Sequence, residues 1–477
     1  MGRGLGRFVT QPPLGFFGGL KGCLERLPFN NRLVKLCLES GDLALERREP
    51  LDLAPKGGHH DLGLGLATGR ALAPPEPVDQ PFGQPSDEDT GHEPPEKRSH
   101  ACTLGDVAFT QSWRQTAEKA GYKARVEWAV IAIYGLLALV AWTNAFFMTR
   151  PREIGSPANF VALIPARNEA GKIGGLVATL CSQGVPVIVY DDGSTDGTAE
   201  EAARAGAKVA RGPATLPEGW TGKNHACDQL AKLAAETSSL EWMVFLDADV
   251  VLGPGFAEGL GSLISTVGFR CPVITGFGRL LPGRGLEPVY LFWVPFLLLA
   301  TNPFGLVSRA RLGHNRFLNG QIVAWRSSED FRWLPHQAVK SRILEDVLIG
   351  RLLARNGVRV EVADLSRVMS VRMYRTMGEA LDGMSKNSHE ITGSVAGTVL
   401  LGFFMVLLAV GWWFGWPASA ALLLLACLGV RTVVRTPLWV LPLAPLSCFF
   451  GALTIARSLV WRKRGVRWKD RTYSPEG

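Results

Sequence analysis

The chain has 477 residues, enough for more than one domain, and its net charge of +8 gives a pI near 9.1. The basic residues form no stripe interleaved with aromatic residues, and no zinc-finger spacing is present, so we expect no nucleic-acid partner. The eight cysteines are scattered without a CxxC pair, which argues against a metal site or a disulfide framework and fits reduced thiols.

The first 120 residues are rich in glycine, proline and charged residues, as in ALAPPEPVDQPFGQPSDEDTGHEPPEKRSH. Such a composition cannot bury enough apolar surface to offset the entropy lost on ordering. We therefore expect residues 1–120 to be a disordered extension, or the product of a translation start assigned too far upstream. Residues 14–40 have some helical periodicity, to which we assign no function.

A first apolar segment, Glu127 to Met148, has one charge at its edge and is long enough to span a bilayer. It lies too deep in the chain to be an ordinary signal peptide. Lys119, Lys123 and Arg125 precede it, and positive charge beside an apolar segment favours an anionic membrane surface. We predict a transmembrane helix over 127–148.

Strand and helix patterns alternate after residue 159. We expect strands at 160–165, 185–190, 207–210 and 241–246, and helices from about 169, at 197–205 and at 224–236. Such alternation is typical of βαβ units, and it predicts an α/β domain with a mostly parallel sheet.

Two acidic signatures each follow a short β-branched run. The first is VPVIVYDDGSTDGT with Asp191 and Asp192, and the second is EWMVFLDADVVLGPG with Asp247 and Asp249. Open α/β sheets bind ligands at the carboxyl ends of their strands, where these carboxylates would lie. Asp247 and Asp249 can place two oxygens near one hard cation, whose other ligands are commonly water and substrate phosphates. The pattern favours a nucleotide-diphosphate site with Mg²⁺ or Mn²⁺.

Other interpretations of these carboxylates are weaker. An isolated DxD is usually a turn or a helix cap, but two signatures in order after strands favour a ligand site. Asp192, Ser194, Asp196 and Gly197 match the first positions of an EF-hand loop. The twelfth position would be Ala203, where that loop needs a bidentate glutamate, so we reject an EF-hand.

The ordered motifs resemble those of family-2 glycosyltransferases with the GT-A fold. The matching stretches are IPARNE, DDGSTDGT, GWTGKNHAC, DAD, NGQ, LEDVLIG and MYRTMGEALDGMSKN, which together predict a GT-A domain over 159–390. Within the family, the chain most resembles the membrane-bound branch that glycosylates carotenoids or accompanies hopanoid pathways. Fold alone would not establish function, so the motif residues carry the inference.

The resemblance implies roles for individual residues at the donor side. The nucleoside wall would consist of Pro165, Ala166, Arg167, Asn168 and Glu169. Asp192 would accept a hydrogen bond from the base edge. Asp249 would be the principal metal ligand, and Asp247 would contact ribose or metal. Lys223 would lie near the phosphates, or else be a solvated lysine at a helix start.

The resemblance also implies that Asp346, in Leu344-Glu345-Asp346, is the catalytic base. It opens a predicted helix over 346–356, where a carboxylate could instead simply stabilise the helix dipole. A single base without a carboxylate nucleophile implies direct displacement and inversion at the anomeric carbon, as in the family.

The acceptor side departs from processive synthases, which have a QxxRW motif. The corresponding place reads Gly383-Met384-Ser385-Lys386-Asn387, so Lys386 would supply the positive charge for the diphosphate as a point charge. This change favours single transfers to a lipid. Acceptor-side residues would be Asn319, Gly320, Gln321 and Glu345.

An apolar run, Pro288 to Ala300, is too short to span a bilayer. Its aromatic residues Tyr290, Phe292 and Trp293 suit a membrane interface, and a buried core helix is the alternative.

Three apolar stretches follow the domain, at 397–416, 418–430 and 438–456, and predict two to three transmembrane helices within 397–460. A cytosolic domain followed by three spans would put the basic tail, 461–477, outside, against the positive-inside rule. One of the last two stretches would then be re-entrant or interfacial. We expect a multi-pass protein of the cell (inner) membrane with its catalytic domain facing the cytoplasm.

The leading hypothesis is an inverting, metal-dependent transferase that moves one sugar from a nucleotide-sugar donor to a lipid (terpenoid-type) acceptor at the membrane. The alternatives are a polyprenyl-phosphate sugar transferase and a non-catalytic membrane scaffold. The sequence does not name the sugar, the nucleotide or the lipid.

Overall fold

The computed structural model of the chain describes residues 104–152, 159–213, 215–237, 241–327, 335–461, 466–468 and 471–473. The described residues from 124 onward fall within one compact unit. The expected extension before residue 104 lies outside the described residues. Of the expected basic tail, the structure describes Trp461 and two antiparallel strands, β11 (Val466–Trp468) and β12 (Arg471–Tyr473).

Helix α3 (Leu104–Phe147) runs from the expected extension into the expected first membrane segment. The boundary predicted at residue 120 is therefore wrong for residues 104–120, which are helical. The composition argument failed here because this stretch lacks the prolines of the preceding residues, and a helix extends easily once an adjacent segment has formed it.

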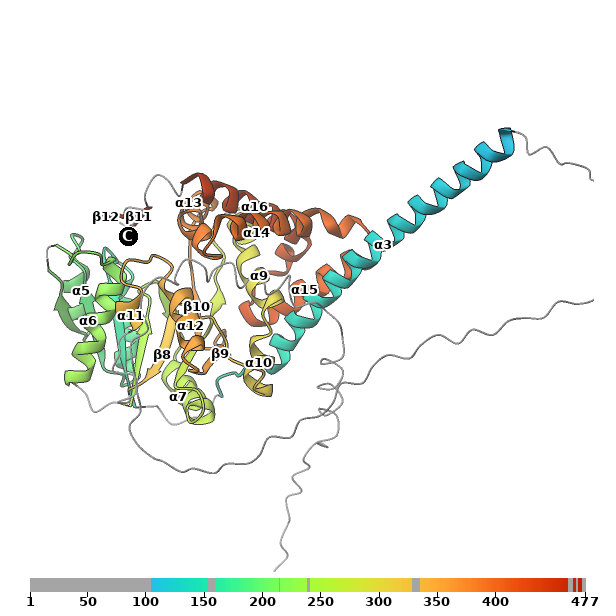
Figure 1. The fold of residues 1–477 in the computed structure, drawn as a ribbon. Helices are drawn as coiled ribbons and strands as arrows, with labels where there is room; N and C mark the ends of the chain where they lie inside the picture. Colours follow the sequence, from blue (N-terminus) through green and yellow to red (C-terminus); the bar gives the residue numbers. More distant parts are fainter. Residues whose placement is uncertain are drawn as a thin grey trace, which may run out of the picture. The chain divides into compact units, whose positions relative to one another are not determined.

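The central sheet has seven strands in the order β3-β2-β1-β4-β8-β6-β9 (Figure 1). All neighbours pair in parallel except β8, which is antiparallel to both β4 and β6. The strands are β1 (Phe160–Ala166), β2 (Val187–Asp191), β3 (Lys208–Arg211), β4 (Trp242–Leu246), β6 (Val273–Phe277), β8 (Ile322–Arg326) and β9 (Val360–Asp364). The predicted α/β class with a mostly parallel sheet is confirmed.

The elements predicted along the first half of the domain are present in the predicted order, with small shifts at their ends. The largest shift is at α4 (Ile173–Ser182), which was expected from about residue 169. Gly171 has a φ of 81°, outside the right-handed helical region, so the helix begins only after it.

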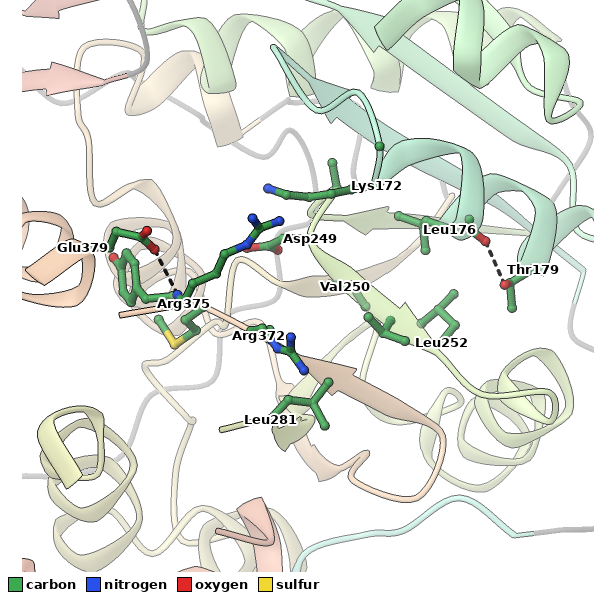
Figure 2. Close-up of a pocket in the computed structure, with 16 residues that line it drawn as sticks. Lys172, Leu176, Thr179, Asp249, Val250, Leu252, Leu281, Arg372, Arg375 and Glu379 are labelled. Carbon is green, nitrogen blue, oxygen red and sulfur yellow. Dashed lines mark hydrogen bonds between the residues drawn. The ribbon is translucent and has the colours of Figure 1, made fainter. Parts of the chain in front are cut away.

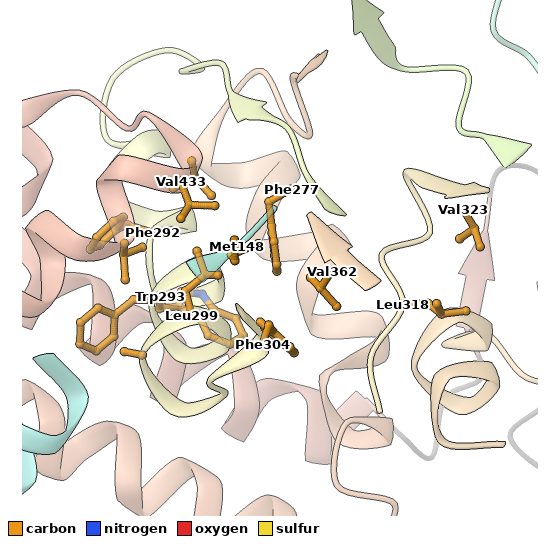
Figure 3. Close-up of a cluster of buried hydrophobic side chains, with 14 of the residues drawn as sticks. Met148, Phe277, Phe292, Trp293, Leu299, Phe304, Leu318, Val323, Val362 and Val433 are labelled. Atoms are coloured by element: carbon orange, nitrogen blue, oxygen red, sulfur yellow. The ribbon is translucent and has the colours of Figure 1, made fainter. Parts of the chain in front are cut away.

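Helices cover both faces of the sheet, because successive side chains of each strand point to opposite faces. On one face, α4, α5 (Thr198–Arg204) and α7 (Phe256–Val267) form one buried apolar cluster with the strands. On the other face, α6 (Gly222–Thr237) and α12 (Glu345–Arg355) join a cluster that also includes the apolar helices. Figure 3 shows Val323 and Val362 of the sheet in this cluster together with Met148 and Trp293.

A small second sheet lies directly after the DxD motif. Its strands are β5 (Val250–Leu252), β10 (Met369–Val371) and β7 (Arg279–Leu280), in the order β5-β10-β7. Because β4 ends at Leu246 and β5 begins at Val250, the Asp247–Asp249 turn is held between two sheets. The short helix α11 (Pro335–Ala338) precedes α12, and α13 (Met377–Asn387) follows β10.

The C-terminal region is helical. It consists of η2 (Ser388–Glu390), α14 (Val395–Val410), η3 (Gly411–Trp413), α15 (Ala418–Val434), η4 (Leu438–Leu443) and α16 (Ala444–Trp461). Among the described residues, four helical stretches are long and apolar enough to cross a membrane: 118–147, 287–310, 395–413 and 438–461. Helix α15 is apolar but shorter.

The apolar run at 288–300 lies within a longer helical stretch, 287–310. This stretch comprises α8 (Glu287–Leu291), α9 (Trp293–Thr301) and α10 (Phe304–Ala310), and its total length is enough to span a membrane. It cannot cross the membrane once, however, because β6 before it and β8 after it pair in the same sheet.

The aromatic residues of this stretch do not lie at a membrane interface as predicted. Tyr290, Phe292 and Trp293 are each at most 1 % exposed, packed among the other apolar helices and the sheet. The alternative, a buried helix, is therefore correct for these three residues. Helix α16 packs against the stretch, and the Tyr290 hydroxyl forms a hydrogen bond with the Thr454 hydroxyl of α16 at 2.6 Å.

Candidate active site

A cavity of about 520 Å³ opens at the edge of the sheet where the parallel strands end. It gathers most of the predicted site residues: Pro165, Ala166, Arg167, Glu169, Asp192, Lys223, Asp247, Asp249, Asn319, Gly320, Gln321, Asp346 and Lys386. Asn168 and Glu345 are the predicted site residues that do not line it. We call this cavity the donor cleft.

The direction of β8 explains how distant motifs meet in the donor cleft. Asn319, Gly320 and Gln321 precede β8, which is antiparallel to its neighbours. The beginning of β8 therefore lies at the same edge as the ends of β4 and β6. Consistent with this placement, the Asp247 amide donates to the Gln321 carbonyl at 3.2 Å.

The loop after β1 is fastened to the loop after β2. Arg167 Nη1 donates to the Asp192 carbonyl and, at 3.2 Å, to that of Gly193. Asn168 has a φ of 51°, its amide donates to Ser194 Oγ at 3.0 Å, and its Oδ1 accepts from the Thr195 amide at 2.9 Å. Asn168 therefore holds the loop after β1 against the loop after β2 without lining the donor cleft.

The two neighbouring aspartates of the first signature have different surroundings. Asp191 Oδ1 accepts from the Ser194 amide at 3.1 Å and so closes the turn after β2. Asp192 is only 2 % exposed and lines the donor cleft. The residue predicted to meet the base edge is thus the one of the pair that reaches the cleft.

The turn of the second signature presents its carboxylates to the donor cleft. The Val250 amide donates to the Asp247 carbonyl at 3.2 Å, which closes the turn. Asp249 Oδ1 is buried and has no hydrogen-bond partner among the described residues. Burial, then the charges of Asp247 and Glu169, raise the pKa of Asp249 to about 6. An orphaned buried carboxylate oxygen in an acidic setting suits a cation ligand.

The donor set fits a hard divalent cation that is shared with a substrate. The described residues contain no cluster of three histidine, cysteine, aspartate or glutamate side chains that could hold a metal by themselves. Asp247 and Asp249 would therefore supply two oxygens, and water with diphosphate oxygens would complete the coordination, as is usual for Mg²⁺.

Lys223, at the start of α6, joins two carboxylates. Its Nζ lies 2.8 Å from Asp247 Oδ1 and 3.0 Å from Glu345 Oε1. Burial by itself lowers the pKa of Lys223, but Asp247 and Glu345 raise it well above the ordinary value, so the amine is cationic. Lys223 is thus not a solvated lysine at a helix start; it is a fixed positive charge in the donor cleft.

Asp346 lies in the first turn of α12, where it is held by backbone amides. Its Oδ2 accepts from the Gly320 amide at 3.0 Å, and its Oδ1 accepts from the Val347 amide at 2.8 Å. Burial raises its pKa. Each oxygen keeps further lone pairs, so the carboxylate is oriented in the cleft and can still accept a proton.

Glu345 has a different position from that expected of an acceptor residue. It is 8 % exposed, does not line the donor cleft, and contacts Lys223. Burial raises its pKa to about 7, although Lys223 lies beside it. The side chain therefore acts on the cleft through Lys223.

Gly320 is packed closely against two charged residues of the site. A Cβ added to it would lie 3.1 Å from Lys223 Nζ and 3.2 Å from Asp346 Oδ2. Its neighbour Asn319 is fixed by a bond from Nδ2 to the Gly276 carbonyl at 2.8 Å. The NGQ loop thus places a backbone amide against the candidate base.

Several lining residues carried no predicted role: Lys172, Gly222, Ala226, Ala248, Ile343, Met373, Tyr374 and Gly383. Met373 and Tyr374 belong to the MYRTMGE stretch, which matched the family without suggesting a role for them. Lys172 forms an ion pair with Glu169 at 2.9 Å. Lys386 reaches the cleft from α13, as expected of a charge near the diphosphate.

Comparisons with known proteins agree with this arrangement. Residues 161–278 match the model of glycosyl transferase family 2. The 4,4'-diaponeurosporenoate glycosyltransferase of Staphylococcus aureus (strain USA300) is 26% identical over 273 residues, which cover 56% of this chain and 68% of the relative.

Solved structures with similarity to the chain include glucosyl-3-phosphoglycerate synthase of Mycobacterium tuberculosis. One such structure has a TM-score of 0.32 and 19% identity, over 53% of this chain and 86% of the other. The same synthase in complex with Mn²⁺, UDP and glucosyl-3-phosphoglycerate has a TM-score of 0.30 and 21% identity, over 51% and 78%.

The sheet order, the motif-bearing cleft, the family match and the Staphylococcus aureus relative define an enzyme of the glycosyltransferase class with a GT-A fold. Residues 161–278 match glycosyl transferase family 2, as the motifs predicted, and the chain is similar to a glycosyltransferase over more than half of its length.

Proposed function

We propose that this enzyme transfers a single sugar from a nucleotide-sugar donor to a lipid acceptor at the membrane, with inversion at the anomeric carbon and a divalent cation as cofactor. The observation that carries the proposal is the donor cleft itself, in which an orphaned carboxylate oxygen of Asp249 and the amide-held carboxylate of Asp346 share one cavity.

The protein residues divide the chemistry among them. A bound cation would neutralise charge on the departing diphosphate, and Lys223 and Lys386 add fixed positive charge nearby. Asp346 takes the proton of an acceptor hydroxyl as its oxygen attacks the anomeric carbon. The loops after β1 and β2 hold the nucleoside, since Arg167 and Asp192 line the cleft beside each other.

The lipid nature of the acceptor is supported by the helices on which the domain is built. The apolar cluster of Figure 3 is continuous from the sheet into these helices, so the cleft is held close to membrane-type segments. The Staphylococcus aureus relative is named for diaponeurosporenoate, a carotenoid-type compound, which we take as a guide to the acceptor class here.

The contacts between helices support a membrane topology with three crossings. Gly135 lies against Leu422, and Trp142 Nε1 donates to the Leu425 carbonyl at 3.0 Å, so α3 and α15 pack along one another. The Tyr134 hydroxyl donates to the Leu408 carbonyl at 2.9 Å, so the C-terminal end of α14 lies beside the part of α3 around Tyr134. In the proposed topology α3, α14 and α15 cross; α15, with 17 residues, is just long enough.

Both ends of the segment after α15 are bound to the catalytic domain. Arg435 Nε donates to Ser366 Oγ at 2.9 Å before it, and Arg457 forms an ion pair with Asp382 at 2.7 Å after it. A segment with both ends on one face enters and leaves on the same side. This re-entrant reading of 436–456 keeps the basic tail on the cytoplasmic side with the domain, in agreement with the positive-inside rule.

Titration of nucleoside diphosphates into the purified full-length protein tests the site. We expect one of UDP, GDP, CDP or dTDP to bind more tightly with Mn²⁺ than without it, and Asp249→Ala to abolish that difference. Glu236→Ala, which removes an exposed carboxylate near the end of α6 that does not line the cleft, is the matched control. Metal-dependent binding that survives Asp249→Ala would contradict the assignment.

A further inference from the structure

A strongly basic loop follows α10 and has no part in the sugar transfer proposed above. Residues 309–316 read RARLGHNR, with three arginines and no acidic residue. Arg309, Arg311 and Arg316 are exposed, and none of them forms an ion pair within the described residues. We call this segment the basic loop. Its positive charge is directed outward, away from any described carboxylate.

The basic loop is fixed at its base and exposed at its tip. The buried Asn315 donates from Nδ2 to the carbonyl of Val360, the first residue of β9, at 3.1 Å. Arg311 has a φ of 54° and Gly313 a φ of 134°, so the chain turns sharply between them. Leu312 lies at this turn and is 57 % exposed. The loop therefore presents an apolar side chain with arginines close to it in the sequence.

The basic loop begins beside the end of α3 that leads into the catalytic domain. The Gly305 amide of α10 donates to Asn144 Oδ1 at 3.0 Å, and the Arg309 guanidinium lies 5.6 Å from the centroid of the Phe147 ring. Phe146 is 67 % exposed, so the apolar surface of α3 continues into its last turn. In the proposed topology α3 crosses the membrane, and this end of α3 lies at the membrane surface.

Strand β9 holds one edge of the central sheet close to the same end of α3. Thr149 Oγ1 donates to Glu361 Oε1 at 2.6 Å, and the Asp364 amide donates to the Thr149 carbonyl at 2.9 Å. The two edge strands of the sheet are β9 and β3. The β9 edge, which also carries the basic loop, therefore adjoins the membrane segment, and charges on β3 lie at the opposite edge.

The basic loop is separate from the donor site. The donor cleft and a second cavity of about 830 Å³ both lie beside the DxD turn. The second cavity is lined from α4, from β5 and from residues 372–379 (Figure 2). None of residues 309–316, all of which the structure describes, lines either cavity. Substitutions in the basic loop therefore leave the lining of both cavities unchanged.

We propose that the basic loop docks on the membrane leaflet that faces the catalytic domain, with its arginines on anionic lipid headgroups and Leu312 at the boundary between headgroups and acyl chains. A lipid surface fits because the loop adjoins the end of a membrane helix and combines positive charge with an exposed apolar tip. The contact holds the β9 edge of the domain at the membrane. It goes beyond the sugar transfer and rests only on the proposed crossing of α3.

Photo-crosslinking from the tip of the basic loop tests the inference. A diazirine analogue of leucine replaces Leu312 in the full-length protein, which is reconstituted in an equimolar bilayer of phosphatidylcholine and phosphatidylglycerol and irradiated. Mass spectrometry of the peptide then identifies the adducts. One basic side chain near an anionic surface typically favours binding about fivefold. We therefore expect phosphatidylglycerol adducts to exceed phosphatidylcholine adducts by that factor or more.

Paired variants show whether the arginines cause this preference. Arg309→Gln combined with Arg311→Gln should bring the two adducts close to equality and leave nucleotide affinity unchanged. Arg204→Gln combined with Lys208→Gln removes the same charge from α5 and β3, at the opposite edge of the sheet, and should keep the preference.

Four results would overturn the inference: no lipid adduct, equal adducts with the arginines intact, an unchanged preference after both loop arginines are replaced, or crosslinking to a second copy or another protein in place of lipid. Absence of nucleotide binding by the wild-type chain would instead count against the proposed function, because the adduct ratio is measured without a nucleotide.

Discussion

Replacing Asp346 by asparagine separates the candidate base from its structural setting. The carboxylate accepts one hydrogen bond at each oxygen, from the amides of Gly320 and Val347. An asparagine can accept only one of them and turns its NH₂ group toward the other donor. A buried donor left unsatisfied costs about 1–3 kcal/mol, so the variant should be less stable by up to that amount and still fold.

The effect on catalysis should be much larger than the effect on stability. General bases typically contribute ~10²–10⁴-fold to rate, so transfer by Asp346→Asn should fall by roughly that factor. Donor affinity should change little, because Lys223 forms its ion pairs with Asp247 and Glu345 rather than with Asp346. Slow hydrolysis of the sugar nucleotide can persist.

The assay measures transfer and nucleotide binding in parallel, with thermal unfolding to account for stability. Glu345→Gln is the comparison variant, and it should alter donor affinity through Lys223 more than it alters turnover. Near-normal transfer by Asp346→Asn, or a defect confined to donor affinity, would refute the role. The base would then be Glu345 or an acceptor that is already anionic.

Three further predictions concern packing, pH and the extension. Gly320→Ala should push Lys223 and Asp346 apart by a few tenths of an ångström, and so lower turnover about tenfold at nearly unchanged stability. Gly378→Ala is the control: an added Cβ there would have no atom within 4 Å, so turnover should not fall. Burial, with Lys223, lowers the pKa of His336 from 6.5 to about 3. As the pH falls, the unfolded chain therefore takes up this proton before the folded chain does. The free energy of unfolding should decrease as pH drops from 6.5 toward 3, by roughly 3–5 kcal/mol in all. His336→Gln should flatten that slope in unfolding measurements, and an unchanged slope would refute the reasoning. Deleting residues 1–103 removes no residue of α3 or of the two cavities beside the DxD turn, so we expect near-normal transfer. Loss of turnover in a truncated protein that still inserts into the membrane would contradict this expectation.

The sequence was sufficient where function follows from local pattern. A carboxylate after an apolar strand must lie at the strand's end, so Asp192, Asp247 and Asp249 could be placed at one edge before the structure was known. The motif IPARNE was likewise placed correctly, because it spans the end of the first strand and the loop after it.

The sequence was insufficient where partners lie far apart along the chain. The antiparallel direction of β8 brings the NGQ loop to the cleft, and no local pattern predicts that direction. The contact between Lys223 and Glu345 joins residues more than a hundred positions apart. The sequence left the apolar run at 288–300 undecided between a membrane interface and a buried helix for a related reason: its burial depends on α16, which the run itself does not specify.

The central claim is tested most directly by lipid mass spectrometry on cells with and without the gene, each supplied with the wild-type chain or with Asp346→Asn. The account predicts a lipid that gains the mass of one sugar residue only when the wild-type chain is present, with the unmodified lipid accumulating otherwise. Identical lipid profiles in all of these cells, or the same glycolipid made by the Asp346→Asn chain at the wild-type level, would contradict it.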